Sequence, residues 1–452
     1  MADSIQMPVI GEYFCDVLVV GAGVAGFSAA VCSARRGANV LLVDKNGCIG
    51  GTATTGLVGP FMSVMDPTGE YPVVKGFLEE FVGRMAKKNG ARLPADCHGG
   101  DSWSAYRKPG HIGVVPFDPE CFKFTAEEVC KEAGVKILYH LLLVRTEVSS
   151  DGTVKKAFFA TKKGIVSISA KVFVDATGDA DLSALSGVKM LFGNEEGRTQ
   201  VSSLFFLVDR VNKEELDAYM EKHPQETDRG SRFFIDIIEK CKKEGTFPCG
   251  RHVFSAFESL NDIWRINMTQ YDDQIDFNDP EQVTKAEIEC RTQIPVLIDW
   301  LKKYVPGFKN VRLLQSSEML GVRESRRIEG EYYLTREDVL KGRDFTDTIA
   351  VIGDSIDVHG KNQSVYVTRT APTQIPYRCL LPKNLSNLIV AGRCLSADQE
   401  AHSAARVMPP CFATGQAAGT AAAIAVKKEI NLKEVDISEL RKALREDGVF
   451  LG

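Results

Sequence analysis

A chain of 452 residues with 44% hydrophobic and 25% charged residues is long enough for two or three folded domains, and this composition excludes a largely disordered protein. The formal net charge of −5 excludes the basic surface that nucleic-acid-binding and membrane-surface proteins use. We therefore expect a small-molecule substrate as the partner, and neither nucleic acid nor a membrane.

The cysteines and the N-terminus indicate the compartment. Twelve cysteines include no C-x-x-C pair, which is typical of reduced core thiols and lacks the usual signatures of zinc and iron–sulfur sites. No spacing of histidines or carboxylates indicates another metal, so we predict no metal site. The N-terminus "MADSIQMPVIGEYF" lacks the regions of a signal peptide, and the richest apolar run, "AAGTAAAIAV", is too short to cross a bilayer. We expect a cytoplasmic protein.

The first motif is a strand, a glycine turn and a helix. Residues 17–20 form an apolar run that predicts a central parallel strand. Gly21, Gly23 and Gly26 follow as G-x-G-x-x-G, in which the glycines permit a tight turn, close approach of a pyrophosphate, and close packing of helix on strand. The helix expected over residues 24–36 would direct its positive N-terminal end at the phosphates. This pattern predicts a dinucleotide site.

The acidic residue that follows the second strand does not decide which dinucleotide binds. Asp44 lies 18 residues beyond Gly26, where a carboxylate accepts a hydrogen bond from a ribose hydroxyl and repels a 2′-phosphate. NAD and FAD both fit this pattern. Gly50 and Gly51 come soon afterwards, beside the hydroxyl of Thr52, and a glycine pair at this place favours FAD.

Two distant segments also resemble ligand-contacting turns. Residues 172–174 read as a strand that runs into Thr177, Gly178 and Asp179. Small residues in such a turn permit close approach of a ligand.

The second of these segments is near the C-terminus. Residues 388–390 read as a strand that ends in Gly392 and Arg393, and a helix is expected to begin near Pro410. Its glycine and alanine face, which includes Gly415, suits tight packing on a sheet.

Taken together, these segments resemble the FAD-dependent oxidoreductase family, a branch of the glutathione-reductase-like flavoproteins distantly related to fumarate reductase flavoprotein subunits. The resemblance covers nearly the whole chain. Besides the first motif, it rests on the segments "GGTATTGLVGPF", "FDPECFKFTAEEV", "VDATGDADL", "GVRESRRIEGEYYLTREDV" and "IPYRCLLPKNLSNLIVAGRCLSADQEAHSAARVMPPCFATGQAAG".

The resemblance implies which residues contact FAD. It assigns the pyrophosphate to the three glycines of the turn, the adenosine ribose to Asp44, and the backbone contacts with adenine to Val144. It also implies that the helix beginning near Pro410 directs its N-terminus at the flavin. The full set of implied cofactor-binding residues is Gly21, Gly23, Gly26, Asp44, Lys45, Gly50, Gly51, Thr52, Val144, Thr177, Gly178, Asp179, Gly392, Arg393 and Gly415.

The expected fold class is α/β. We predict a discontinuous Rossmann-like FAD-binding domain of the glutathione reductase type, formed by residues 1–75, 120–200 and 375–452, with an inserted α+β substrate domain at 201–374. Residues 76–119 are expected to form a lid or loop.

Within the inserted region, residues 264–269 alternate apolar and polar side chains, which predicts a half-buried strand. Residues 279–308 predict a long helix that is interrupted or begins near Pro295.

The predicted catalytic residues are His402, Arg406 and Arg393. His402 and Arg406 are four residues apart, so they share one face of a helical turn next to the flavin-facing segment. The imidazole could move a proton and Arg406 could hold a carboxylate or the flavin, whereas a structural histidine with a salt-bridged arginine is the alternative. Arg393 follows a strand end beside the cofactor.

Two further sets of residues are candidates for a chemical role. Arg323, Arg326 and Arg327 could clamp an anionic substrate, and a solvated helix face is the alternative. Cys394 and Cys411 fall near the predicted flavin, where a buried inert thiol is the favoured interpretation over a reactive one.

The sequence therefore predicts an FAD-dependent oxidoreductase that transfers hydride between noncovalent flavin and a small organic substrate. One alternative is an NAD-binding biosynthetic enzyme of the thiazole synthase type, and another is a flavin-bearing electron-transfer subunit. The absence of a second G-x-G-x-x-G and of a C-x-x-x-x-C pair disfavours a pyridine-nucleotide disulfide reductase. The sequence is also compatible with a homodimer, because folds of this kind often dimerise.

Overall fold

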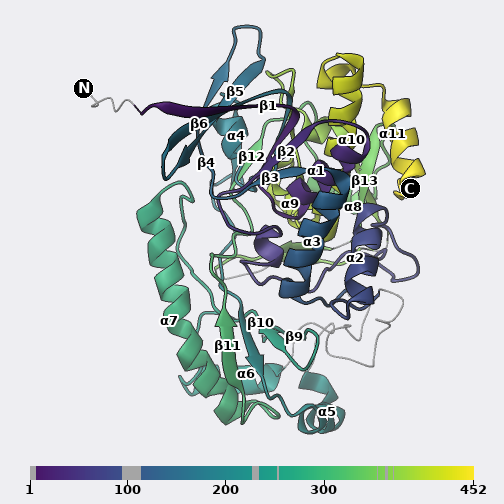
Figure 1. Ribbon diagram of the computed structural model, residues 1–452. Helices are drawn as coiled ribbons and strands as arrows, with labels where there is room; N and C mark the ends of the chain where they lie inside the picture. The colour runs from purple at the N-terminus through teal and green to yellow at the C-terminus, as the bar shows by residue number, and fades with distance from the viewer. Residues whose placement is uncertain are drawn as a thin grey trace.

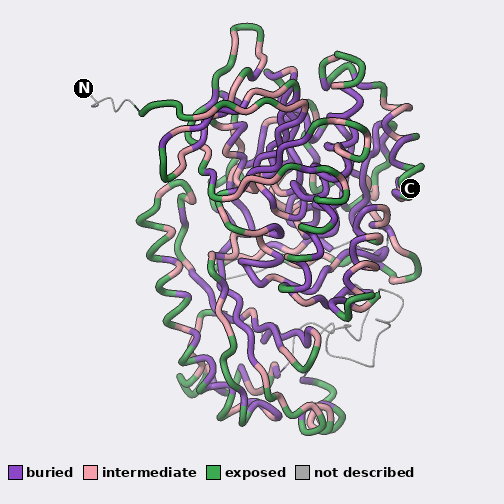
Figure 2. The backbone as a smooth tube through the Cα atoms, viewed as in Figure 1, coloured by how far each residue is buried: buried purple, intermediate pink, exposed green. Residues whose placement is uncertain are grey.

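The computed structural model describes residues 7–93, 113–226, 234–251, 254–353, 355–361, 365–369 and 371–452. Figure 1 shows two parts: a large sheet with helices α10 and α11 at one end of the molecule, and strands β9 to β11 with helices α5 to α7 at the other. Buried backbone follows both sheets in Figure 2, and each part has its own group of packed apolar side chains.

The main sheet is Rossmann-like. In the described part of the chain it has seven strands, in the order β3-β2-β1-β6-β5-β4, with β17 beside β6. Strand β1 runs parallel to β2 and β6, and β17 runs parallel to β6, whereas β5 is antiparallel to β4 and β6. The apolar run at residues 17–20 lies between β2 and β6 and is buried, as predicted. The strands are β1 (Val9–Val20), β2 (Val40–Val43), β3 (Lys136–Leu138), β4 (Leu142–Val148), β5 (Val154–Thr161), β6 (Gly164–Asp175) and β17 (Leu388–Val390).

Helices cover this sheet, and two of them touch each other through glycine. A Cβ atom on Gly415 of α10 would lie 2.2 Å from the carbonyl oxygen of Ala25 in α1, and one on Gly419 would lie 2.1 Å from that of Ala29. The two glycines of this face therefore pack on helix α1, and α10 also lies against strands β1, β6 and β17 of the sheet, as we expected. The helices of this part are α1 (Val24–Arg35), α2 (Phe77–Lys87), α3 (Pro119–Ala133), α4 (Asp181–Leu185), α10 (Met408–Lys428) and α11 (Ile437–Glu446).

The second part is a four-stranded antiparallel sheet in the order β11-β8-β10-β9. Its long helix α7 corrects a prediction: it begins at Pro280, where Asp279 accepts a hydrogen bond from the Glu281 backbone nitrogen at 2.9 Å, and it runs on through Pro295. Figure 1 shows it along one side of this sheet. The elements are β8 (Phe206–Asp209), β9 (Ala256–Glu258), β10 (Trp264–Ile266), β11 (Arg312–Ser316), α5 (Lys213–Lys222), α6 (Ile235–Lys243) and α7 (Pro280–Tyr304).

Strand β10 is buried on both faces, which also differs from the predicted half-buried strand. Arg265 is 1% exposed, because its guanidinium donates hydrogen bonds to the carbonyl oxygens of Val58 at 2.7 Å and Phe117 at 2.6 Å. Its Cζ lies 4.3 Å from the centre of the Phe117 ring. Burial lowers the pKa of Arg265 to about 9. One charged side chain thus ties the second sheet to loops of the first part.

The remaining elements are short, and many of them belong to the core of the first part. They are β7 (Met190–Phe192), β12 (Arg326–Ile328), α8 (Arg336–Lys341), β13 (Thr348–Ile352), β14 (Ile356–Val358), β15 (Val365–Val367), β16 (Thr373–Pro376), α9 (Gln399–Ala405), and the 3₁₀ turns Gly51–Ala53, Pro224–Glu226, Tyr377–Leu380, Gly392–Cys394 and Leu432–Glu434. Residues 76–119, expected as a lid or loop, begin with helix α2, whose Phe77 and Phe81 are in the main core; residues 94–112 lie outside the described part. The predicted domain boundaries stay a prediction.

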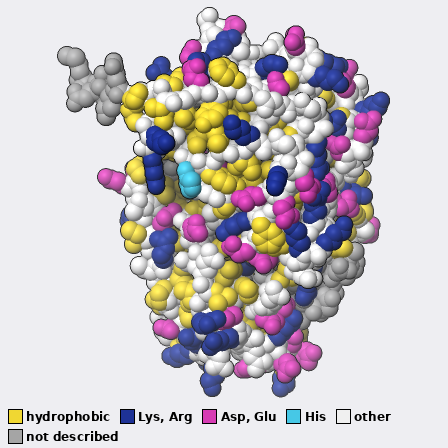
Figure 3. All heavy atoms as spheres, in the orientation of Figure 1, with side chains coloured by type: hydrophobic (Ala, Val, Ile, Leu, Met, Phe, Trp, Pro, Cys, Tyr) yellow, Lys and Arg dark blue, Asp and Glu magenta, His cyan; other side chains and the backbone are white. Residues whose placement is uncertain are grey.

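The surface agrees with the modest net charge. On the face that Figure 3 shows, Lys and Arg side chains are interspersed with Asp and Glu. Of the helices in the described residues, none has the length and apolar character needed to cross a membrane.

Candidate active site

The three glycines of the turn after β1 have two different roles. Gly21 has a φ of +96°, and a Cβ atom there would lie 2.4 Å from the Ala176 carbonyl oxygen. A Cβ atom on Gly26 would lie 1.8 Å from the Gly21 carbonyl oxygen. These two glycines serve close packing within the protein. Gly23 differs, because a Cβ atom there would meet nothing within 4 Å, and Gly23 lines a cavity at the start of α1.

The loop after β2 closes against this turn. Asp44 lines the cavity, and its carboxylate accepts hydrogen bonds from the backbone nitrogens of Ala22 at 2.5 Å and Asn46 at 2.7 Å. Burial raises the pKa of Asp44. The Gly50 nitrogen donates to the Ala22 carbonyl oxygen at 2.8 Å, so Gly50 supports the turn without lining the cavity. Lys45, Gly51 and Thr52 do line it.

The end of β6 supplies an ion pair at the cavity wall. Thr177, Gly178 and Asp179 line the cavity, and Asp179 Oδ1 lies 2.8 Å from Nη2 of Arg393. Asp179 also accepts a hydrogen bond from the Ser325 hydroxyl at 2.6 Å. Burial opposes ionisation, but the charge of Arg393 and this hydrogen bond outweigh it and lower the pKa of Asp179. Arg393 is therefore held as a charged group at the cavity, next to Gly392.

Helix α10 begins at the cavity. Val407, Met408 and Cys411 line it, as does Arg406 at the end of α9. The N-terminal end of a helix carries partial positive charge, which favours an anionic group beside it. The Cys411 thiol donates to the Arg406 carbonyl oxygen at 3.3 Å, and burial raises its pKa to about 12. Burial likewise raises the pKa of Cys394, so both are inert thiols at neutral pH.

His402, predicted to move a proton, is not brought to the cavity. Its side chain is fully buried, and Nε2 donates to the Arg393 carbonyl oxygen at 2.9 Å. Burial, reinforced by the charge of Arg327, lowers its pKa far below the ordinary value for histidine. The imidazole is neutral and positions the Arg393 backbone, which matches the structural alternative.

Two of the other implied residues also lie away from the cavity. Val144 is in β4, is 41% exposed and does not line the cavity, so a contact with adenine has no support here. Gly415 does not line it either, because its place is the contact with α1. The predicted contact of Gly415 with FAD stays a prediction.

The arginines of residues 323–327 separate into different roles. Arg327 forms a buried ion pair with Glu324, and Arg326 pairs with Asp181. Arg323 alone of the three lines the cavity. The segment enters strand β12, so neither a three-arginine clamp nor a solvated helix face describes it.

Beyond α10, the cavity continues under the second sheet. Phe205 and Phe257 line it there with Met319 and Val322, and the whole cavity, its mouth included, encloses about 1650 Å³. It extends from the glycine turn to the second sheet as one space.

Asp357 and His359 line this far end, and the sequence analysis did not identify them. His359 Nε2 lies 2.8 Å from Asp357 Oδ2. A signal was present in their spacing: Asp357 lies in strand β14 (Ile356–Val358) and His359 directly follows it, and residues two apart in an extended segment face the same way. Burial lowers the pKa of His359 to about 4, and Arg323 and Arg251 act in the same direction although Asp357 opposes them. The ring is neutral at neutral pH.

This histidine predicts a pH dependence of stability. An unfolded histidine titrates near 6.5, so between pH 6.5 and 4 the unfolded chain binds a proton that the folded chain does not, and stability falls as the pH falls through this window. Urea denaturation should show that the His359→Gln variant loses about 1–2 kcal/mol less than the parent between pH 7.5 and pH 5. Equal losses would show that His359 titrates normally.

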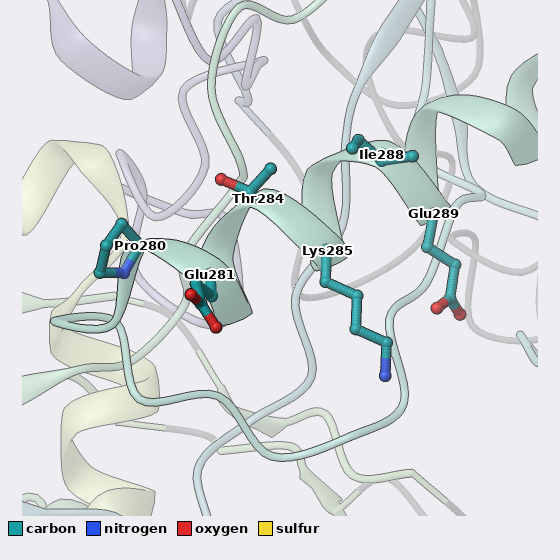
Figure 4. Close-up of a pocket in the computed structure, with 6 residues that line it drawn as sticks. All are labelled: Pro280, Glu281, Thr284, Lys285, Ile288 and Glu289. Carbon is teal, nitrogen blue, oxygen red and sulfur yellow. The ribbon is translucent and has the colours of Figure 1, made fainter.

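A second hollow lies on the surface of α7. Its lining residues Pro280, Glu281, Thr284, Lys285, Ile288 and Glu289 all belong to this helix. Figure 4 shows them along one helix, with none from a second element. A single helix face does not converge polar groups on a ligand, so the hollow does not carry the chemistry.

The geometry defines a class of protein. A parallel sheet, a glycine turn and an acid after the second strand form one end of a long cavity, which is the arrangement of dinucleotide-binding proteins. The family of FAD dependent oxidoreductases matches residues 16–444, and the chain belongs to this family. Its cofactor is FAD, which removes the NAD alternative. No curated protein matches the chain.

Three solved structures illustrate the similarity of the fold. A geranylgeranyl bacteriochlorophyll reductase-like protein from Thermoplasma acidophilum has 12% identity and a TM-score of 0.49, over 96% of this chain and 84% of that one. An L-amino acid deaminase from Proteus myxofaciens has 11% identity and a TM-score of 0.49, over 97% and 95%. The p-nitrophenol 4-monooxygenase PnpA from Pseudomonas putida DLL-E4 has 12% identity and a TM-score of 0.47, over 97% and 84%. Sequence identities and TM-scores as low as these give no information about the substrate of this chain.

Proposed function

We propose that this protein transfers hydride between noncovalently bound FAD and a small organic substrate that lies under the second sheet. One observation carries the proposal: a single cavity runs from Gly23 and Asp44, past the start of α10, to Phe205 and His359. FAD, when bound, supplies the hydride chemistry, and the protein supplies orientation, electrostatics and proton handling.

The residues that we propose for FAD are those of the predicted set that line the cavity. Gly23 leaves space at the start of α1 for the pyrophosphate, and Asp44 accepts a ribose hydroxyl. The start of α10 favours negative charge at the flavin end. The full proposed set is Gly23, Asp44, Lys45, Gly51, Thr52, Thr177, Gly178, Asp179, Gly392 and Arg393.

We further propose that His359, and not His402, handles the proton. The bond from Nε2–H of His359 to the Asp357 carboxylate fixes the tautomer, so Nδ1 carries the lone pair that accepts a proton. Because His359 is neutral at neutral pH, this acceptor is available. Arg393 and Arg406 stay the proposed contacts for the cofactor and the substrate.

The test of this function starts with the absorption spectrum of protein purified without added cofactor. Flavin bands, with FAD released on denaturation, support the proposal, and anaerobic bleaching by candidate substrates then identifies the reductant. A colourless protein that does not take up added FAD contradicts it. Co-purification with a redox protein, without bleaching by any small molecule, would favour the electron-transfer subunit instead.

A variant of the ribose acid gives a quantitative test. Asp44→Asn keeps the shape of the side chain but removes its charge, and a hydrogen bond to a charged group contributes about 1.5–3 kcal/mol. We expect the dissociation constant of FAD to rise roughly tenfold to a hundredfold. Asp16→Asn is the control, because Asp16 pairs with Lys171 outside the cavity. Equal FAD affinities of the parent and the Asp44→Asn variant would refute the ribose contact.

A further inference from the structure

The side-chain amide of Asn267 is fixed in one orientation at the cavity wall. Asn267 lines the cavity, and its Oδ1 accepts hydrogen bonds from Nη1 of Arg251 at 2.9 Å and from the Ser203 hydroxyl at 3.1 Å. A guanidinium group only donates, so the amide atom that faces Arg251 must be the oxygen. If oxygen and nitrogen exchanged places, two donors would face each other. Arg251 therefore decides the orientation of the amide.

The groups around this amide are themselves held in place. Arg251 is 5% exposed and does not line the cavity, and Ser203 is 1% exposed. The Gly321 nitrogen donates to the Ser203 carbonyl oxygen at 2.8 Å, and the Asn267 nitrogen donates to the Ser255 carbonyl oxygen at 2.8 Å. Because both donors to the amide oxygen are buried, water competes little for it.

The amide nitrogen of Asn267 is left as a donor at the cavity. Among the residues that the structure describes, Nδ2 has no hydrogen-bond partner. This nitrogen is not buried, because Asn267 lines the cavity. A ligand that covers it without accepting a hydrogen bond leaves a polar group unsatisfied, which is unfavourable. The wall therefore favours a ligand with an acceptor oxygen at this point.

An aromatic ring lies beside this donor. Strands β10 and β8 pair with Ile266 opposite Phe206, so one step further along the pair Asn267 comes opposite Phe205. Residues opposite each other in an antiparallel pair project to the same face, with Cβ atoms about 4.5–5.5 Å apart. Phe205 lines the cavity as Asn267 does, and so does Phe257 from the neighbouring strand β9. The donor thus adjoins an aromatic wall.

We infer that the substrate is an aromatic compound with a carbonyl group next to its ring, and that Nδ2 of Asn267 donates to the carbonyl oxygen. This inference rests on the proposed function, in which FAD fills the end of the cavity beside the glycine turn. Asn267 is then a substrate-binding residue, and Arg251 is a positioning residue, because it acts through Asn267.

Calorimetric titration of the holoprotein with acetophenone tests the inference. α-Methylstyrene is the control ligand, because a CH₂ group replaces the carbonyl oxygen in a molecule of nearly the same shape. From the strength of a neutral hydrogen bond and the cost of leaving a donor unpaired, we expect acetophenone to bind roughly tenfold more tightly. Equal or tighter binding of α-methylstyrene, or binding of neither compound, overturns the inference.

The Asn267→Asp variant locates the binding. It keeps the size of the side chain and the contact with Arg251, but it replaces the donor by an acceptor that repels a carbonyl oxygen. We expect acetophenone to bind roughly tenfold or more weakly, and α-methylstyrene to bind as before. Asn310→Asp, at an exposed turn outside the cavity, is the matched control and should keep the parent's preference. Unaltered acetophenone binding by Asn267→Asp overturns the inference.

Variants of Arg251 test its positioning role. Arg251→Met removes the donor, so the amide can turn, and the preference for acetophenone over α-methylstyrene should fall roughly threefold or more. Arg251→Lys, whose side chain also only donates, should restore the preference. A merely structural role would weaken both ligands alike, and an unchanged preference in Arg251→Met overturns the positioning role.

Failure of this inference is distinct from failure of the proposed function. Protein that is purified without FAD and does not take it up contradicts the proposed function, but titration of that protein with the two ligands still decides whether Asn267 binds a carbonyl oxygen. The comparison of the two ligands on the parent protein also decides the inference where a variant does not fold.

Discussion

The Gly415→Ala variant is expected to lose more than about 3 kcal/mol of stability, or to fail to fold, although it adds a single methyl group. The new Cβ would lie 2.2 Å from the Ala25 carbonyl oxygen and 2.9 Å from its Cα. These are backbone atoms of α1, so no rotation of a side chain relieves the contact. Helix α1 or α10 must move, and both begin at the cavity.

Gly83→Ala is the matched control. Gly83 also lies inside a helix, α2, but a Cβ atom there would meet nothing within 4 Å. Alanine is the better helix former by about 1 kcal/mol, so this variant should be slightly more stable than the parent. Urea denaturation of the two variants separates crowding from helix propensity. If both changed stability alike, the close contact of α1 and α10 would not exist in solution.

The Gly23→Ala variant should fold normally and lose FAD. Gly23 has an extended backbone, with φ −61° and ψ 178°, which alanine adopts without strain. Its Cβ would project into the cavity at the place proposed for the pyrophosphate. Overpacking of this kind costs roughly 1–3 kcal/mol, so the FAD dissociation constant should rise roughly tenfold to a hundredfold.

Two measurements are needed for this variant. The melting temperature of the FAD-free protein should match that of the parent, and FAD fluorescence titration should show the loss of affinity. Gly26→Ala is the companion variant, and it should not fold, because its Cβ would lie 1.8 Å from the Gly21 carbonyl oxygen. Normal FAD affinity in Gly23→Ala would exclude the pyrophosphate from the glycine turn.

The sequence predicts the cofactor end of the cavity better than the substrate end. Gly23, Asp44 and Asp179 each belong to a short segment in which a strand ends and the chain turns, and such a segment carries its geometry locally. The parallel sheet then places these strand ends side by side. The local sequence motifs and the order of the strands therefore indicate the same place, so the sequence alone predicts the residues that line this end of the cavity.

The substrate end is built by contacts that no local pattern records. Asn267, Arg323 and His359 come from separate loops, and only the folded chain brings them to the wall of one cavity. Arg265 looks like a solvated residue in an alternating strand, yet distant carbonyl groups hold it inside. His402 shows the converse, because a favourable spacing on a helix turn did not reveal that the ring faces the Arg393 backbone.

The order of strands in the main sheet has a consequence for synthesis. Strand β6 pairs with β1 near the N-terminus and with β17 at residues 388–390, and α10 must still follow before α1 gains its partner. Such long-range pairing makes folding slow. On a ribosome that adds about 5–20 residues per second, most of the chain emerges before the last strand of the sheet is available. Binding of FAD is therefore expected late in synthesis, and a chain truncated before β17 should accumulate as an incomplete sheet in which part of β6 is an open edge.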